Sequence, residues 1–225
     1  MHMLPRLIST FPRKQFMQTS SAEFREAKQV ASGRKGMSAQ DIANQQKAGG
    51  FSGASTPVPA DAPGPGADAS SDFQTFQHSS FTVQYPTNWQ PSGDQNSMVT
   101  LAPKGGVTGD AVAYGAILYS FRPEARDLDG AFQELVASIK QSNPDLRQVG
   151  QAEPIRVNGV GGRSIDLLGP SPIQASGKPL QERDWLVAVP NSQGTLVYAV
   201  FIAPDKDFNS LRPTFEKMLK TLHVK

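Results

Sequence analysis

The chain contains no cysteine among its 225 residues. This absence excludes disulfide bonds, thiolate catalysis and metal sites with cysteine ligands. Histidine is almost as scarce, because only His2, His78 and His223 are present and they lie far apart in the sequence. Zinc in proteins takes three or four convergent ligands, so we expect no metal-ligating residues and no cofactor. His78, between two predicted strands, is expected to be a surface residue rather than a metal ligand.

Long apolar segments are also missing. No run approaches the ~20 residues that a helix needs to cross a bilayer. Residues 1–16 do not form a secretory signal, since Pro5 and Pro12 interrupt a short apolar stretch. The same residues have traits of a transit peptide, with several basic residues and no acid before Glu23. We favour the alternative that the chain starts partway into a longer ancestral protein.

An excess of basic residues is confined to the first part of the chain. Residues 1–50 carry eight Lys and Arg against three Asp and Glu, a net charge of +5, whereas residues 51–225 carry 14 against 17, a net charge of −3. Nucleic-acid binding needs a basic face that neutralises phosphates, so it is disfavoured for the second part. The basic residues of the first part are expected to be solvated, with contact to an acidic surface as the alternative.

Composition also predicts where the folded part begins. Residues 49–71 consist almost wholly of Gly, Ala, Ser, Pro, Thr and Asp. Such a segment cannot bury enough apolar area to offset its ordering entropy, so we expect a largely disordered linker. It separates a basic leader, residues 1–48, from a domain at residues 72–225, which is close to the usual domain size. In the leader, a short helix is predicted at residues 21–31 and a weaker helical segment at residues 38–47.

The clearest pattern in the domain lies near its end. Residues 196–203 form an unbroken apolar run rich in β-branched and aromatic residues, which is typical of a strand covered on both faces. Pro204 ends the strand, since proline lacks the N–H that a ladder needs. Apolar residues then recur at helical spacing and predict an amphipathic helix whose buried stripe is Leu211, Phe215, Met218, Leu219 and Leu222.

The other elements are predicted from caps, turns and alternation. A helix is expected at residues 127–141, with Asp127 as its N-cap. Asn158–Gly159 predicts a hairpin, because Asn-Gly tolerates positive φ at both turn positions. Residues 191–194 predict a second hairpin between the strands on either side of them. Consecutive antiparallel strands with two separated helices give an α+β fold, a mainly antiparallel sheet with helices against its faces. Strands are predicted on both sides of Ser79–Ser80 and at residues 98–102, 111–121, 154–157, 160–167, 180–189 and 195–203.

Three residues are weak candidates for a binding surface. Glu182 and Asp184 lie two apart and would share one face of a strand, a spacing that could present paired carboxylates. We favour the simpler interpretation that they pair across strands with Arg163 or Arg156, or that they are exposed to solvent. Trp89, which has prolines on both sides, is expected in the core, with a half-exposed recognition surface as the alternative.

No catalytic residues are predicted. Ser164, Ser171 and Ser176 lack a Gly-x-Ser-x-Gly context and a histidine partner, so a hydrolase triad has little support. The glycine-rich residues 159–163 superficially resemble a nucleotide-binding loop. A strand rather than a helix is expected to follow them, so we interpret them as part of a hairpin.

A series of short motifs runs through residues 73–225. They are Phe81-x-Val83-x-Tyr85-Pro86-x-Asn88-Trp89, Leu101-Ala102-Pro103-x-Gly105-Gly106, Ala113-Tyr114-Gly115, Asn143-Pro144-x-Leu146, Val157-Asn158-Gly159, Glu182-x-Asp184-Trp185-Leu186-Val187, Tyr198-x-Val200-Phe201-Ile202-Ala203-Pro204 and Phe215-x-x-Met218-Leu219. In this order they resemble a PsbP/Mog1-type domain, and most of all the version appended to the C-terminus of bacterial M48-type zinc metallopeptidases. Leu4-Pro5 and Glu23-Phe24-Arg25-x-x-Lys28 in the leader are similar to the connector of such a peptidase.

The chain departs from these peptidases in one decisive respect. M48 peptidases carry His-Glu-x-x-His on a helix, where two histidines bind zinc and the glutamate activates water. No such motif is present here. The resemblance therefore implies an α/β/α sandwich that acts as a non-catalytic accessory domain.

The resemblance also implies what surrounds the domain. The expected partner is a protein or protein substrate, such as a metallopeptidase domain, and the expected location is the bacterial cell envelope or periplasm, with the cytoplasm as the alternative. Two other functions remain open. One is a small-ligand-binding or catalytic pocket that uses Glu182 and Asp184, and the other is a free-standing PsbP-like protein with a cleaved leader.

Overall fold

The computed structural model of the chain describes residues 68–108 and 111–225. The predicted leader, its helical segments and most of the predicted linker lie outside these residues. All the strand pairs formed by the described residues are antiparallel. The main sheet contains, in spatial order, β3 (Trp89–Ser92), β4 (Val99–Pro103), β7 (Gly115–Phe121), β11 (Leu196–Pro204), β10 (Lys178–Pro190), β9 (Val160–Ala175) and β8 (Arg147–Val157).

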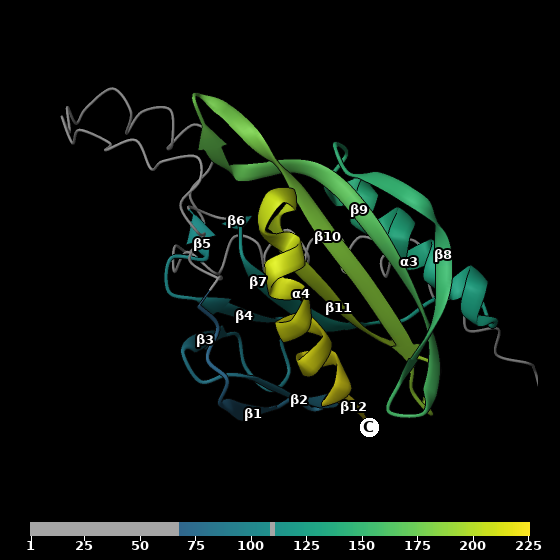
Figure 1. The fold of residues 1–225 in the computed structure, drawn as a ribbon. Coiled ribbons are helices and arrows are strands. Elements are labelled where there is room, and N and C mark those ends of the chain that lie inside the picture. Colours follow the sequence, from purple (N-terminus) through teal and green to yellow (C-terminus); the bar gives the residue numbers. More distant parts are fainter. Residues whose placement is uncertain (1–67, 109–110) are drawn as a thin grey trace, which may run out of the picture.

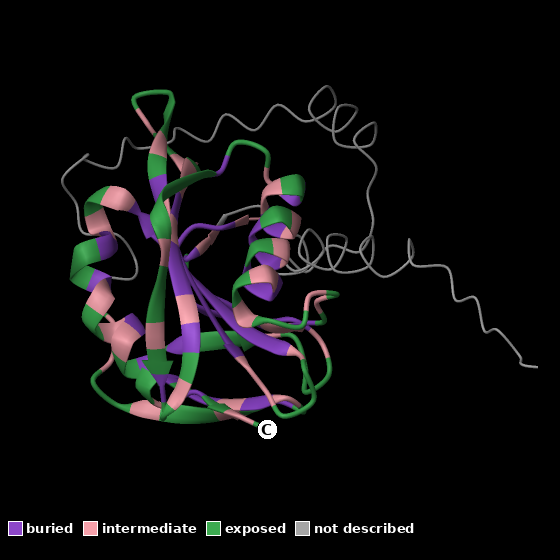
Figure 2. Ribbon diagram, turned by 90° about the vertical axis from the view of Figure 1, so that its right-hand side faces the viewer, coloured by how far each residue is buried: buried purple, intermediate pink, exposed green. Residues whose placement is uncertain are grey.

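Two helices cover opposite faces of this sheet (Figure 1). α3 (Leu128–Ser142) packs on one face and α4 (Asp205–Lys220) on the other, and the buried side chains form one cluster under each helix. Figure 2 shows the buried central strands between the partly exposed helices. The predicted α+β fold, a mainly antiparallel sheet flanked by helices, is therefore confirmed.

β11 is the central strand of this arrangement, and all nine of its residues are buried. Its side chains alternate between the two clusters, with Val197, Ala199 and Phe201 toward α4 and Tyr198 and Val200 toward α3. Successive side chains of a strand point to opposite faces, so a strand covered on both faces must be apolar throughout. The unbroken apolar run predicted this position correctly.

α4 follows directly and buries four of the five predicted stripe residues, whereas the fifth, Leu222, is buried but lies beyond the end of the helix at Lys220. Leu211, Phe215, Met218 and Leu219 are all buried, and the rings of Phe215 and Phe201 lie 5.1 Å apart between centroids. The helix begins six residues before the first of the predicted stripe residues and adds Phe208 to the stripe. It continues through Pro213, which lacks the N–H for an internal hydrogen bond, because the stripe on either side is anchored in the core.

The start of α3 also matches its prediction. The Asp127 side chain accepts a hydrogen bond from the Gly130 N–H at 2.8 Å, which satisfies one of the open N–H groups of the first turn. Glu134, in the next turns, accepts from the backbone N–H groups of Glu124 and Ala125 and so holds the loop that enters the helix.

A small second sheet closes the end of the core beside α4. Its order is β1 (Phe73–Gln77), β2 (Phe81–Pro86) and β12 (His223–Val224). β2 turns Phe81, Val83 and Tyr85 into the cluster under α4. The two strands predicted around Ser79–Ser80 are β1 and β2, and the C-terminal β12 was not predicted.

The predicted single strand over residues 111–121 is wrong. The chain forms β6 (Ala111–Val112), which pairs with β5 (Val107–Thr108), and β7 starts only at Gly115. Gly115 has φ of +144°, and a Cβ there would lie 2.5 Å from the carbonyl oxygen of Leu101. This close approach breaks the strand, although the apolar sequence gives no sign of it.

The far side of the main sheet is longer than the sequence suggests. β8, β9 and β10 extend well beyond the predicted strands, and β9 and β10 are joined by an additional hairpin at Ser176–Gly177. Both turn residues have positive φ, +52° and +75°. The predicted hairpins at Asn158–Gly159 and residues 191–194 connect β8 to β9 and β10 to β11, as expected.

Residues 68–71, which precede the predicted domain boundary at Asp72, contact the domain. The Asn88 side chain donates to the Asp68 carbonyl oxygen at 2.8 Å and accepts from the Ser70 N–H at 2.9 Å. Ala69 packs against the cluster under α4. The last residues of the predicted linker, 68–71, are therefore attached to the domain. Among the described residues, no helix is both long and apolar enough to cross a membrane.

Candidate functional site

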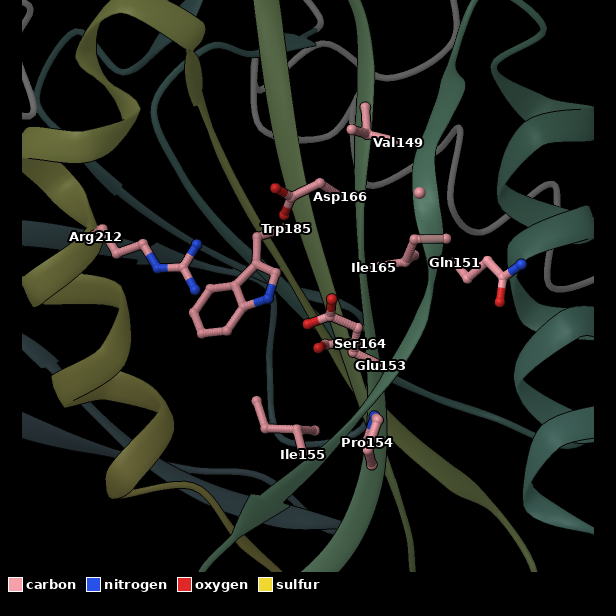
Figure 3. Close-up of a pocket in the computed structure, with 11 residues that line it drawn as sticks. Val149, Gln151, Glu153, Pro154, Ile155, Ser164, Ile165, Asp166, Trp185 and Arg212 are labelled. Atoms are coloured by element: carbon pink, nitrogen blue, oxygen red, sulfur yellow. The ribbon is translucent and has the colours of Figure 1, made fainter.

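A groove lies between α4 and the outer strands of the main sheet (Figure 3). Its volume is about 290 Å³, and residues of β8, β9, β10 and α4 line it. This is just below the ~300–1,000 Å³ usual for small-molecule sites, so the groove has room for one large side chain or a small molecule. The residues that define its chemistry are Val149, Glu153, Ile155, Ser164, Asp166, Trp185 and Arg212.

The groove forms where β8 bends away from β9. Val149 lies opposite Asp166 and Glu153 lies opposite Ser164, so four steps along β8 match two steps along β9. The resulting bulge contains Gly150, whose φ of +73° is accessible to glycine at little cost. Val149 is left 46% exposed and is the one exposed large hydrophobic residue of the described chain.

Trp185 and Arg212 form the boundary between the groove and α4. The Arg212 guanidinium carbon lies 4.4 Å from the centroid of the Trp185 ring, a cation–π contact. The indole also packs on Phe201, 5.3 Å away between centroids. Arg212 donates from Nε to Glu216 Oε1 at 3.2 Å, one turn further along the helix. Tryptophan and arginine are enriched among the residues that dominate interface energetics.

A second arginine, Arg183, holds the wall of the groove that contains Asp166. Arg183 donates to Asp166 at 3.2 Å and to Asp205 at 2.7 Å, and so connects β9, β10 and the first turn of α4. Its guanidinium carbon also lies 5.6 Å from the Phe208 ring centroid. These contacts hold Asp166 in place at the groove wall.

The charge of the groove is negative. We count the charged lining residues together with their ion-pair partners, which are four carboxylates (Glu153, Asp166, Asp205 and Glu216) and two guanidinium groups (Arg183 and Arg212), a net charge of −2. In the part of the chain that the structure describes, Glu153 takes part in no ion pair. Its exposed carboxylate is therefore the one available to a ligand.

Trp89 is not at a surface. It is 2% exposed, and its ring meets Phe215 edge-on at 6.3 Å between centroids. It starts β3 with its side chain in the core, as its neighbours predicted, so the alternative of a half-exposed recognition surface is wrong. Nothing in the structure brings Trp89 to the groove.

Glu182 and Asp184 are also buried, each 1% exposed. They share one face of β10, as their spacing predicted, but this face belongs to the side of the sheet that α3 covers and not to the groove. The expected pairs are not formed, because Arg163 pairs with Asp129 and Arg156 donates to a carbonyl oxygen of the hairpin turn. Solvent exposure was also a wrong expectation, since β10 lies between two strands with both faces covered.

His78 is buried as well, at 2% exposure, and the expected surface position is wrong. Its ring stacks on Phe81 at 4.3 Å. Nδ1 accepts the Ser80 N–H, so Nε2 carries the proton and donates to the Ser97 carbonyl oxygen at 3.1 Å. Burial lowers the pKa of His78 below its ordinary value of 6.5. In residues 68–108 and 111–225, no three His, Asp or Glu side chains gather as a metal site would require.

The groove residues were not predicted as a site. Glu153, Asp166 and Arg212 are ordinary surface residue types in no recognisable motif, and they come together only through the pairing of β8, β9 and β10 with α4 beside them. Trp185 is only 5% exposed, so it does not stand out as a surface residue. The closest sequence signal is the valine–glycine step at Val149, which we did not interpret as a bulge.

No protein-family model and no curated protein matches this sequence. Several solved structures are similar to it. Cyanobacterial PsbP from Synechocystis sp. PCC 6803 has a TM-score of 0.49 and 10% identity, and the match covers 75% of this chain and 100% of that chain. The Ran-binding protein Mog1p of Saccharomyces cerevisiae has a TM-score of 0.49 and 11% identity, with coverage of 68% and 95%.

LpqN, involved in cell envelope biogenesis of Mycobacterium tuberculosis, is also similar, with a TM-score of 0.39, 11% identity and coverage of 68% and 91%. PsbP and Mog1 are the two types of domain that the sequence motifs resemble. At this level of identity the similarity concerns the fold alone. The connection to M48 peptidases stays a prediction.

Proposed function

We propose that this chain is a non-catalytic domain that binds a protein partner or protein substrate and accompanies an M48-type zinc metallopeptidase of the bacterial cell envelope. The groove beside α4 carries the first part of this proposal. It combines an exposed apolar residue, Val149, with a tryptophan–arginine pair and an unpaired carboxylate. The order of the sequence motifs supports the peptidase context.

The groove suits recognition better than catalysis. Asp166 is engaged by Arg183, and Arg212 is engaged by Trp185 and Glu216. General acid–base chemistry needs a titratable group that can reach the reacting atom and exchange a proton with it. Glu153 alone remains available and, as an exposed carboxylate, has no second group to act with.

Small-ligand binding is the second candidate, because a groove of about 290 Å³ has room for a small molecule. The sequence predicted that such a pocket would use Glu182 and Asp184. Both residues lie on the other face of the main sheet, so a ligand in the groove would meet Glu153 and Asp166 instead.

Proteolysis assays test the non-catalytic part of the proposal. The purified full chain should not hydrolyse casein, whether zinc or a chelator is added. Zinc-dependent hydrolysis that the chelator stops would overturn it. The peptidase context is tested by the coding sequence immediately upstream, where a frame encoding His-Glu-x-x-His is expected and unrelated genes would count against it.

A further inference from the structure

We propose that the groove binds a lysine or arginine side chain from an extended segment of the protein partner, with arginine preferred. This rests on the proposed function, because it names the chemistry of the partner that the groove receives. The site is defined by Glu153, Ser164 and Asp166 on the sheet and by Val149 and Ile155 beside them (Figure 3).

Charge selects a cation. The groove and its ion pairs have a net charge of −2, and both guanidinium groups are already held by carboxylates. Among the residues that the structure describes, Glu153 is the groove carboxylate without an ion pair, and Ser164 lies opposite it in the β8–β9 register. A guanidinium can donate two parallel hydrogen bonds to a carboxylate, whereas an ammonium acts as a point charge, so arginine is the better ligand.

The apolar lining selects a long aliphatic stem. Val149 is exposed at the bulge, and Ile155 is only partly buried at the other end of the groove. Arginine and lysine side chains place methylene groups on apolar surface while the charged head stays polar. A purely apolar side chain would cover Glu153 and Ser164 without satisfying them, which costs free energy. An acidic side chain would meet charges of its own sign.

Matched peptides test the proposal on the full chain. The probes are capped heptapeptides of glycine, serine and valine with arginine, citrulline or glutamate at the central position. Citrulline keeps the shape of arginine and removes its charge. The indole N–H signal of Trp185 in NMR spectra reports binding at the groove. The arginine peptide should bind about tenfold more tightly than the citrulline peptide, and the glutamate peptide should not bind.

Two variants with the same change of charge separate the groove from general electrostatics. Glu153→Gln should reduce the arginine-to-citrulline ratio to near one. Glu124→Gln removes an exposed carboxylate outside the groove and should leave the ratio unchanged. Equal affinities of the two peptides, an unchanged ratio in Glu153→Gln, or no binding to the wild-type chain would overturn the proposal.

The basic leader of the chain is the other possible occupant. Replacing Arg6, Arg13 and Lys14 with glutamine in the full chain should leave peptide affinity unchanged. A gain in affinity would mean that the leader competes with the peptide for the groove. The proposal that a partner protein occupies the groove would then be overturned in favour of the leader. None of these outcomes bears on casein hydrolysis, so failure here is distinguishable from failure of the proposed function.

Discussion

The ring of His78 is held in its neutral form by its two hydrogen bonds. Its Nδ1 accepts the Ser80 N–H, so a proton added there would remove the acceptor and place a charge in the core. The C-terminal Lys225 adds a further penalty, because its ammonium group donates to the His78 carbonyl oxygen at 2.6 Å. The side chain thus couples the stability of this region to pH.

Stability should fall between neutral and mildly acidic pH because of this residue. The folded pKa of His78 lies below its ordinary value of 6.5, so its contribution is complete above pH 6.5 and is lost as the pH falls through the lower folded pKa. Urea unfolding between about pH 7.5 and about pH 5 measures the slope, in a range above most carboxylate titration. His78→Gln should flatten the slope, whereas the exposed His223→Gln should not. Equal slopes in both variants would contradict this.

Phe215 should make a large contribution to stability. It is fully buried between α4 and β11, and truncation leaves a cavity, so Phe215→Ala should lower the free energy of unfolding by about 3–5 kcal/mol. Glu216→Ala is the neighbouring control. Glu216 pairs with Arg212 near the surface, and exposed pairs at this spacing contribute about 0.3–0.5 kcal/mol. Small, equal losses in denaturant unfolding would mean that α4 does not dock.

Single residues were predictable where the reason is local. The cap at Asp127 follows from the residue and the three positions after it. The burial of His78, Glu182 and Asp184 does not, because it depends on strands and helices from distant parts of the chain that cover them. Polar residue types are usually exposed, and these three are exceptions that tertiary packing creates.

At the scale of elements, the bulge of β8 shapes the groove and also protects the sheet. β8 is an edge of the main sheet, and an exposed edge strand can pair with another chain. The break in register and Pro154 both make such pairing less regular. The same bend leaves the Val149 side chain exposed at the groove.

Alanine substitutions at Gly150 and at Gly161 test whether the bulge requires a positive φ. A Cβ would meet no atom within 4 Å at Gly150 or at Gly161, but only Gly150 has positive φ, at +73°. Gly150→Ala should therefore lower the free energy of unfolding by about 1–2 kcal/mol through backbone strain. Gly161→Ala should change it by no more than about 0.5 kcal/mol. Denaturant unfolding compares them, and a Gly150→Ala variant as stable as wild type would mean that the bulge relaxes.

The elements that sequence predicted well are those with a strong internal period. β11, α3 and α4 have either an unbroken apolar run or a helical stripe. β3, with the sequence WQPS, and the two-residue strands β5, β6 and β12 have neither. Their existence depends on a partner strand, such as β4 for β3, which the local sequence does not reveal. The groove was unpredictable for the same reason, since it is assembled from four elements.

At the scale of the whole molecule, hydrogen bonds from Asn88 to Asp68 and Ser70 attach residues 68–71 to the domain. Limited proteolysis of the full chain should remove the leader and linker and leave a fragment of about 150 residues, an ordinary domain size. Its new N-terminus should lie at or before Asp68, because the contacts of residues 68–71 protect the backbone there. Mass spectrometry identifies the end. Uniform digestion through the domain, or a first stable end beyond Asp72, would contradict this.

The last residues of the chain have a consequence for self-association. β12 covers the outer edge of β2 through the pairs His223↔Thr82 and Val224↔Phe81. Without it, β2 would present open N–H and C=O groups that a second chain could use. Deletion of residues 223–225 should therefore produce concentration-dependent dimers or larger species in light scattering, whereas Lys225→Ala, which keeps the strand, should not. In the described chain, two residue pairs are thus enough to occupy the edge of β2 that the deletion would open.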